Sequence, residues 1–255
     1  MFTLNHFIWL AICLVYILSI VFLQSKYKLS ITKILSIFLV ICFLSETIKV
    51  FDGMVFYNAD KEVTTNINEI AYAYLDQAKL PFHLCSLHIF LAIIARLTQS
   101  EKTRSVLLNI IAPTGIIGAF IPLFVLIYEP CFDRIVLYEY FLYHASLIAL
   151  GIVLIKEGYC QMTFKNLTRT MLFLVCMLFL SLYVNSLLGI DSEVNFMYTS
   201  YPPVEGLPII NLNNGWFVYI LSFVMIAVVT MGLLYLPFII TRYIKTKKIK
   251  NVINE

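Results

Sequence analysis

The sequence predicts an all-α polytopic membrane protein, a seven-transmembrane helical bundle that takes up residues 1–255 as one unit. Hydrophobic residues make up 61% of the chain and charged residues only 13%, and the mean hydropathy is +0.89. Soluble domains average about 25% charged residues, so a soluble fold is excluded. No nucleic-acid-binding motif is present, and membrane lipids are the expected partners.

Seven apolar stretches have the length, about 17–25 residues, that a bilayer core requires of one helix. They cover residues 6–24, 32–51, 80–97, 106–127, 138–155, 169–188 and 215–239. The first is expected to remain as a helix, because no Lys or Arg precedes its apolar core and no small-residue cleavage site follows it. The third is the weakest, since it is short and begins with polar residues.

The fourth stretch carries Pro113, Gly115, Gly118 and Pro122. A proline removes a backbone donor and bends a helix, and neighbouring helices must then satisfy the freed carbonyl. Two interpretations stay open. The small residues allow ordinary close packing between helices, or the bend opens a cleft that lipid can reach.

Lys and Arg residues divide unevenly between the two sides of this bundle. Fourteen of the 18 lie in the connections after the first, third and fifth stretches, at the adjoining ends of the stretches, or in the C-terminal segment. Only Lys49, Lys61, Lys79 and Arg134 lie on the other side. Because basic residues favour the cytoplasmic side, we expect an external N-terminus, a cytoplasmic C-terminus and a basic cytoplasmic tail at 240–255. Frequent Ile, Asn, Lys, Phe and Tyr suggest a bacterial plasma membrane.

Polar side chains inside the stretches gather at one depth on the external side. At a rise of 1.5 Å per residue, Cys85 lies about 8 Å and His144 about 9 Å inside the ends of their helices. Glu46 and Asn185 lie about five residues below the same surface. Ionisable residues at membrane depth are costly and usually face the bundle interior. We therefore expect one polar cavity in the outer leaflet, with unrelated interhelical hydrogen bonds as the alternative.

Helical periodicity assigns faces to the residues of the third stretch. Residues three and four apart share a face, so Pro81, Cys85 and His88 are expected to form one stripe. His83 is expected to point away and to make a structural hydrogen bond to Glu46 or to the 52–79 connection. That connection is long for a bundle, and we expect it to cover the cavity mouth through a short interfacial helix at NEIAYAYLDQ, with a solvated loop as the alternative.

A thiol and an imidazole at matched depth favour nucleophilic chemistry. A base must raise the thiolate fraction before Cys85 becomes a good nucleophile, and His144 can take and return that proton. Ser86, Tyr143 and Asn185 are neutral donors at the right depth to stabilise an oxyanion. This combination suits acyl transfer or ester hydrolysis on a lipid.

Other uses of the same residues stay open. Cys85, His88, His144 and Glu46 could gather around zinc, but no paired motif such as HExxH is present, and we expect no metal and no cofactor. An intramembrane Glu and His beside a bent helix could also relay protons or a substrate. Glu46 and Lys49 are spaced as a local ion pair.

Four segments resemble one known family. They are LPFHLCSL, YFLYHASLIALGIVLI, YVNSLLGIDSEVNFMYTSYPP and NNGWFVYILSFVMIAVVTMGLLYLPF. In this order, over residues 80–238, they are similar to the YwaF-type integral membrane protein family, the group of human transmembrane protein 164, a lipid acyltransferase. The resemblance implies that Cys85 accepts the acyl group and that His144 is its partner. The chain departs from that family at Ser86, where an acidic residue is common, and at NNGWFVY, where a Gly-Pro-Trp-Pro-Trp-like stretch is usual.

The sequence thus predicts an intramembrane acyltransferase or lipid hydrolase that acts on outer-leaflet phospholipid or lipoprotein acyl chains through a thioester on Cys85. Residues expected to support the pair or to contact substrate are His83, His88, Ser86, Glu46, Tyr143, Asn185, Asn195, Tyr198 and Trp216. The alternative is a non-enzymatic lipid or small-molecule binding protein, or a transporter, that uses the same cavity. The headgroup, the acceptor and the oligomeric state stay open.

Overall fold

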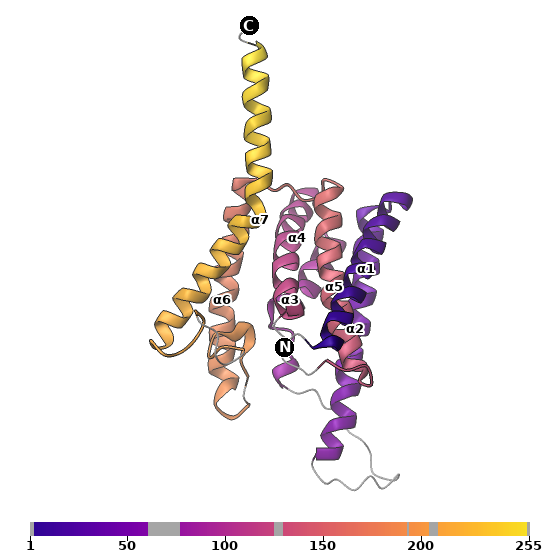
Figure 1. The fold of residues 1–255 in the computed structure, drawn as a ribbon, viewed down its shortest axis with the longest axis vertical. Coiled ribbons are helices and arrows are strands. Elements are labelled where there is room, and N and C mark those ends of the chain that lie inside the picture. Colours follow the sequence, from indigo (N-terminus) through magenta and orange to yellow (C-terminus); the bar gives the residue numbers. More distant parts are fainter. Residues whose placement is uncertain (1–2, 61–76, 125–129, 193, 204–208, 254–255) are drawn as a thin grey trace.

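The chain folds as a set of apolar helices (Figure 1). The structure is a computed structural model that describes residues 3–60, 77–124, 130–192, 194–203 and 209–253. Within these ranges it contains seven α-helices and two short 3-10 helices, and no strand. They are α1 (Leu4–Tyr27), α2 (Ile31–Asp60), η1 (Gln77–Lys79), α3 (Leu84–Leu97), α4 (Glu101–Phe124), α5 (Ile135–Lys156), α6 (Phe164–Ser192), η2 (Phe196–Tyr198) and α7 (Trp216–Ile253).

Six of these helices are long and apolar enough to cross a membrane, which identifies a multi-pass membrane protein. The exception is α3, whose 14 residues span about 21 Å at 1.5 Å per residue, against about 30 Å of bilayer hydrocarbon. The third helix begins at Leu84 rather than near residue 80. Tight turns precede it, in which the Leu80 amide donates to Gln77 and the Phe82 amide donates to Leu80. The count of seven spans therefore stays a prediction.

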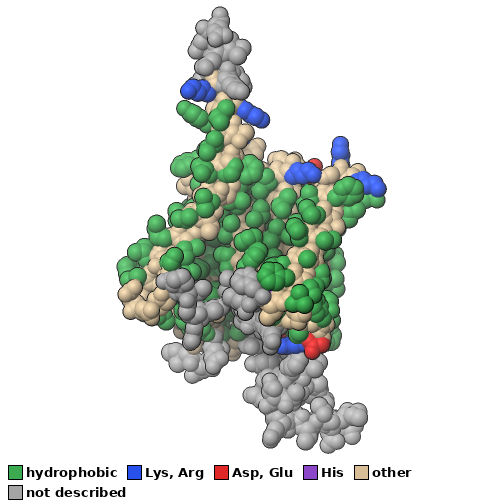
Figure 2. Space-filling view, in the orientation of Figure 1, with side chains coloured by type: hydrophobic (Ala, Val, Ile, Leu, Met, Phe, Trp, Pro, Cys, Tyr) green, Lys and Arg blue, Asp and Glu red, His purple; other side chains and the backbone are tan. Residues whose placement is uncertain are grey.

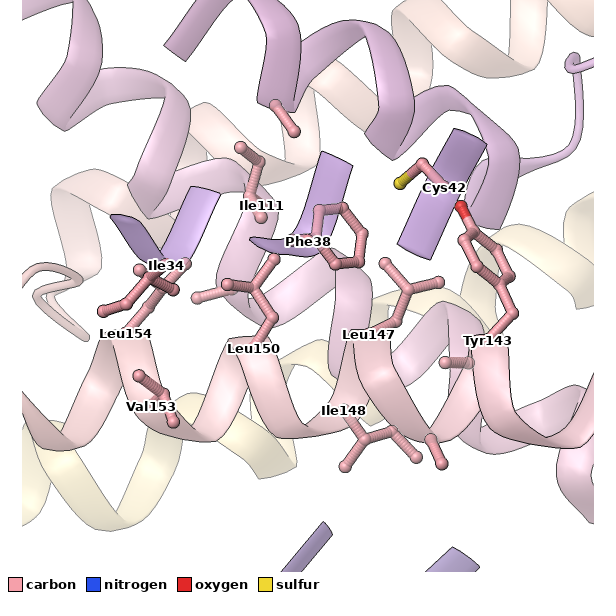
Figure 3. Close-up of a cluster of buried hydrophobic side chains, with 14 of the residues drawn as sticks. Ile34, Phe38, Cys42, Ile111, Tyr143, Leu147, Ile148, Leu150, Val153 and Leu154 are labelled. Atoms are coloured by element: carbon pink, nitrogen blue, oxygen red, sulfur yellow. The ribbon is translucent and has the colours of Figure 1, made fainter. Parts of the chain in front are cut away.

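Helix α5 lies at the centre of the fold and packs against α1, α2 and α4. Figure 3 shows Phe38 and Cys42 of α2 facing Leu147 and Tyr143 of α5. In a membrane, such contacts stabilise through close packing rather than through escape from water. α4 and α5 approach closely at Gly151, where an added Cβ would lie 2.6 Å from the Ala112 carbonyl oxygen.

The carbonyl that Pro113 frees in α4 receives the compensation that a membrane requires. Pro113 cannot donate to the Asn109 carbonyl, and the Thr170 hydroxyl of α6 donates to it instead, at 3.3 Å. Near the end of α4, the Tyr140 hydroxyl donates to the carbonyl of Pro122 at 2.7 Å and so ties α5 to this helix. Small residues on the same helix do allow close packing, and Leu84 contacts Gly118.

Helices α6 and α7 form a pair beside the other helices, and α7 runs well past the end of the bundle (Figure 1). The basic segment predicted as a tail from residue 240 continues α7 as a helix to Ile253, with Pro237 inside it. α1 begins at the lower end in Figure 1 and α7 ends above the upper end. Basic side chains gather at that upper end (Figure 2). The end that faces the cytoplasm stays a prediction from this asymmetry.

The predicted lid falls mainly outside the described residues. Residues 52–60 continue α2 instead of starting a loop, and residues 77–79 form η1. The segment 61–76, which contains most of the predicted interfacial helix, lies outside the described ranges. Where the description resumes, Ala78 and Lys79 line the cavity described next.

Candidate functional site

A partly open cavity of about 360 Å³ lies between α3, α4 and α5 on one side and α6 and α7 on the other. Most of its wall is apolar. The apolar wall is formed by Ile117, Ile121, Met171, Leu174, Val175, Leu178, Phe223, Val224, Ile226, Ala227 and Met231. Polar residues also line the cavity: Lys49, Lys79, His83, Cys85, Ser86, Glu139, Tyr140, Tyr143, His144, Tyr198 and Thr230. A cavity of this composition matches an amphipathic ligand better than a small polar one.

Cys85 lies in the first turn of α3 and lines this cavity. Its Sγ atom is 4.0 Å from the hydroxyl oxygen of Ser86. The Tyr143 hydroxyl donates to the Cys85 carbonyl oxygen at 2.9 Å, and Tyr143 is almost fully buried. This hydrogen bond ties the turn that carries the thiol to the central helix.

His144 lines the same cavity from α5. Its Nδ1 atom is 2.6 Å from the Tyr140 carbonyl oxygen. A carbonyl oxygen only accepts, so Nδ1 carries the hydrogen, and in the neutral ring Nε2 keeps a free lone pair. Nε2 makes no hydrogen bond to any described residue, and it is not fully buried, so it faces the cavity. The ring is thereby oriented as a base.

Two charged residues that the sequence argument did not assign to the site also line the cavity. The Lys49 ammonium donates to Glu46 at 2.8 Å, which is the predicted local ion pair. It lines the cavity together with Glu139 and Cys85 and lies 5.6 Å from the Tyr143 ring centre. The Ser45 hydroxyl donates to the Glu139 carboxylate. A carboxylate one residue inside the predicted fifth span was the available signal for Glu139.

The predicted orientation of His83 is wrong. His83 and Cys85 line the same cavity, whereas His88 does not. Helical periodicity does not apply to Pro81 or His83, because α3 begins at Leu84 and His83 is its extended N-cap residue. His83 does make a hydrogen bond, but the donor is the backbone amide of Met197, at 3.3 Å from Nδ1, rather than Glu46.

His88 and Glu46 lie outside the cavity lining. His88 is fully buried, and its Nδ1 donates to the Leu84 carbonyl at 2.7 Å. Its Nε2 lies 3.0 Å from the Thr114 hydroxyl, so the ring joins α3 to α4. The four residues considered for zinc are therefore not brought together, and the described part of the chain holds no cluster of three or more potential metal ligands.

Asn185 holds the segment around η2 in place. Its amide nitrogen donates to the Phe196 carbonyl at 3.1 Å and to the Thr199 hydroxyl at 2.8 Å, and its Oδ1 accepts from the Phe196 amide at 2.9 Å. Asn185 does not line the cavity, and its donors are fully used. It therefore positions the segment, which sends Met197 and Tyr198 to the cavity wall, rather than facing a ligand.

Asn195 and Trp216 have the same positioning role. The Asn195 side chain donates to the Tyr201 carbonyl at 2.8 Å and accepts from the Ser200 amide at 3.0 Å. The Trp216 indole donates to the Thr199 carbonyl at 2.8 Å. Neither lines the cavity. Of the nominated supporting residues, the structure brings His83, Ser86, Tyr143 and Tyr198 to the cavity together with Cys85 and His144.

Comparison with known proteins identifies one family. The model of the TMEM164 family matches residues 1–235. No curated protein and no solved structure matches the chain.

Proposed function

Since the chain belongs to the TMEM164 family, we propose that this multi-pass membrane protein is a lipid acyltransferase or lipid hydrolase with Cys85 as nucleophile and His144 as general base. The observation that carries the proposal is the cavity. Cys85 and His144 line one cavity, whose apolar wall comes from α4, α6 and α7. The Nε2 lone pair of His144 faces this cavity. A thiol, a base and room for a hydrocarbon chain are the parts that acyl transfer from a lipid requires.

The reaction proceeds in two steps. Sγ of Cys85 attacks the carbonyl carbon of a lipid ester while Nε2 of His144 takes the thiol proton, and the carbonyl π electrons move to oxygen. Collapse of this adduct breaks the C–O bond, and His144 returns the proton to the departing alcohol. The thioester on Cys85 is then attacked by a second alcohol, or by water in a hydrolase, with His144 again acting as base.

Cationic side chains beside the thiol favour a phospholipid as donor. Lys49 lines the same cavity as Cys85. Lys79 also lines the cavity and is held at 3.2 Å from Asp52. With the acyl chain along the apolar wall and the ester at Cys85, the lipid phosphate lies near these ammonium groups. On the predicted orientation, such a lipid comes from the outer leaflet.

Reconstitution in nanodiscs tests the proposal. The bilayer contains phosphatidylglycerol and phosphatidylethanolamine with labelled acyl chains, and the readouts are lysolipid release and hydroxylamine-sensitive label on the protein. Cys85→Ala and His144→Ala are each expected to lower turnover by roughly 10³-fold or more, and the double variant is expected to be no worse than either single one. Cys176→Ser is the matched control, because Cys176 is exposed on α6. Equal turnover by Cys85→Ala and wild type refutes the proposal.

A non-enzymatic lipid binder or transporter remains the alternative, because the same cavity can hold a lipid without reacting with it. A thiol-reactive probe with a fatty-acyl tail distinguishes the two. An activated thiol is expected to react at Cys85 far faster than at Cys176, and His144→Ala is expected to slow only the Cys85 reaction. A binder retains labelled lipid equally in wild type and in both Ala variants, without any covalent label.

A further inference from the structure

We propose that His83 is a third catalytic residue, a neutral hydrogen-bond donor whose Nε2–H stabilises the oxyanion formed when Cys85 attacks an ester. This inference rests on the proposed function and extends it. From the sequence, His83 is expected to make a structural hydrogen bond and to be one of the residues that support the pair or contact substrate. The structure places its ring on the cavity wall with Cys85 and His144.

The hydrogen-bond partners of the two histidine rings give them opposite tautomers. Nδ1 of His83 accepts from the Met197 amide at 3.3 Å. An amide N–H only donates, so Nδ1 of His83 carries a lone pair, the ring is neutral, and Nε2 carries the hydrogen. In His144 the arrangement is reversed, because Nδ1 donates to the Tyr140 carbonyl. One ring therefore presents a donor and the other a base.

The donor of His83 is available to a ligand. Its Nε2 makes no hydrogen bond to any residue that the structure describes, and this atom is not fully buried. Burial of the ring disfavours its charged imidazolium form, and the positive charge of Lys49 on the same cavity wall does so further. His83 thus offers an N–H donor to the cavity while its ring is neutral.

The segment around η2 fixes the orientation of the ring. Phe196 and Tyr198 each place a ring centre 5.4 Å from that of His83. Met197 and Tyr198 adopt φ angles of 52° and 54°, a left-handed conformation that non-glycine residues adopt only where their surroundings hold them in it. The hydrogen bonds of Asn185 hold this turn. A preorganised donor, fixed before the substrate arrives, is what oxyanion stabilisation requires.

Other donors that the sequence nominated are already used. The Tyr143 hydroxyl donates to the Cys85 carbonyl, and the Asn185 amide donates to Phe196 and Thr199. The Ser86 hydroxyl lies 4.0 Å from the Cys85 thiol and is better placed to contact sulfur than a carbonyl oxygen. Compared with Tyr143 and Asn185, His83 presents to the cavity a neutral N–H that no described residue accepts.

A crossed pair of substitutions separates catalysis from structure. In His83→Asn, Oδ1 replaces Nδ1 and keeps the acceptor for Met197, but the cavity donor is lost. In His83→Gln, the amide nitrogen replaces Nε2 and keeps the donor, but the acceptor is lost. Removal of one oxyanion donor typically costs about 10²–10³ in kcat. We expect His83→Asn to slow thioester formation by about 10²–10³-fold, and His83→Gln to stay within about tenfold of wild type.

Alkylation of Cys85 by iodoacetamide is the control reaction, because it forms no oxyanion. We expect both His83 variants to be alkylated at the wild-type rate. The inference is overturned if His83→Gln is slower than His83→Asn, or if alkylation falls in parallel with thioester formation. Folding of each variant is checked by its unfolding temperature. If wild type itself behaves like Cys85→Ala with lipid esters, the proposed function fails, and the role of His83 fails with it.

Discussion

The close approach of α4 and α5 at Gly151 predicts that even one added methyl group there disturbs their packing. An alanine Cβ at this position would lie 2.6 Å from both the Ala112 carbonyl oxygen and the Ile116 Cγ1 atom. Ordinary contacts begin at about 3.4 Å, so the helices must separate by about 0.8 Å. The blocking oxygen belongs to the backbone and cannot rotate away. Overpacking of this kind costs about 1–3 kcal/mol.

The shift also reaches the site. Gly151 lies two helical turns from His144 on the same face of α5, so displacement of α5 moves the base relative to Cys85 on α3. A misplacement of about 1 Å can cost about 10²-fold in rate. We therefore expect Gly151→Ala to lower both the unfolding temperature in detergent and the rate of thioester formation, although alanine favours a helix over glycine by about 1 kcal/mol.

Gly232→Ala on α7 is the matched control, because no atom lies within 4 Å of its added Cβ. At Gly232 the alanine only raises helix propensity, so we expect a small rise in unfolding temperature and unchanged turnover. The measurement is the thermal unfolding temperature of both variants in the same detergent. Equal unfolding temperatures for the two alanine variants would refute the argument that close backbone approach limits this site.

Two further predictions concern the hydrogen bonds around the cavity. Asn185→Leu leaves the buried Phe196 amide without its acceptor, whereas the Phe196 carbonyl loses Asn185 but keeps longer hydrogen bonds from Thr199. The unsatisfied amide costs about 1–3 kcal/mol. We expect faster limited proteolysis within residues 194–203, and an unchanged proteolysis pattern contradicts this role. Tyr143→Phe removes the hydroxyl that donates to the Cys85 carbonyl. A hydrogen bond between membrane helices contributes about 0.6 kcal/mol, so we expect a small loss of stability. We also expect a several-fold slower alkylation of Cys85. An alkylation rate equal to wild type would show that the bond does not position the thiol.

The helices could be predicted from hydropathy because each apolar stretch is long enough to decide its own structure. The start of α3 could not, since Pro81 and the tight turns around Leu80 override the apolar pattern, and this single boundary reversed the predicted face of His83. α7 was expected to end at residue 239, because the charged residues that follow signal an exit from lipid but do not stop a helix.

The candidate pair shares one cavity, but the helix depths that suggested it were wrong. α3 begins at Leu84 and α5 at Ile135, so Cys85 lies in the first turn of its helix and His144 lies deeper in α5. The pairing of these two residues as nucleophile and base stays a prediction. Glu139 and Lys49 required tertiary structure, because their contacts with the site come from neighbouring helices. Asn185 was found at the right depth, but its partners lie on the η2 segment, which no periodicity argument places.

The apolar cavity wall formed by α4, α6 and α7 has a consequence for how the rate of the proposed enzyme depends on substrate concentration. Apolar residues line most of the space, so under the proposed function a lipid would reach Cys85 by lateral diffusion within the membrane rather than through water. The quantity that governs occupancy is then the mole fraction of donor lipid in the membrane, not its molarity. Adding more vesicles of the same composition leaves the rate per protein unchanged, whereas diluting the donor with an inert lipid lowers it. Bilayer composition, rather than lipid supply, becomes the variable to which such a site responds.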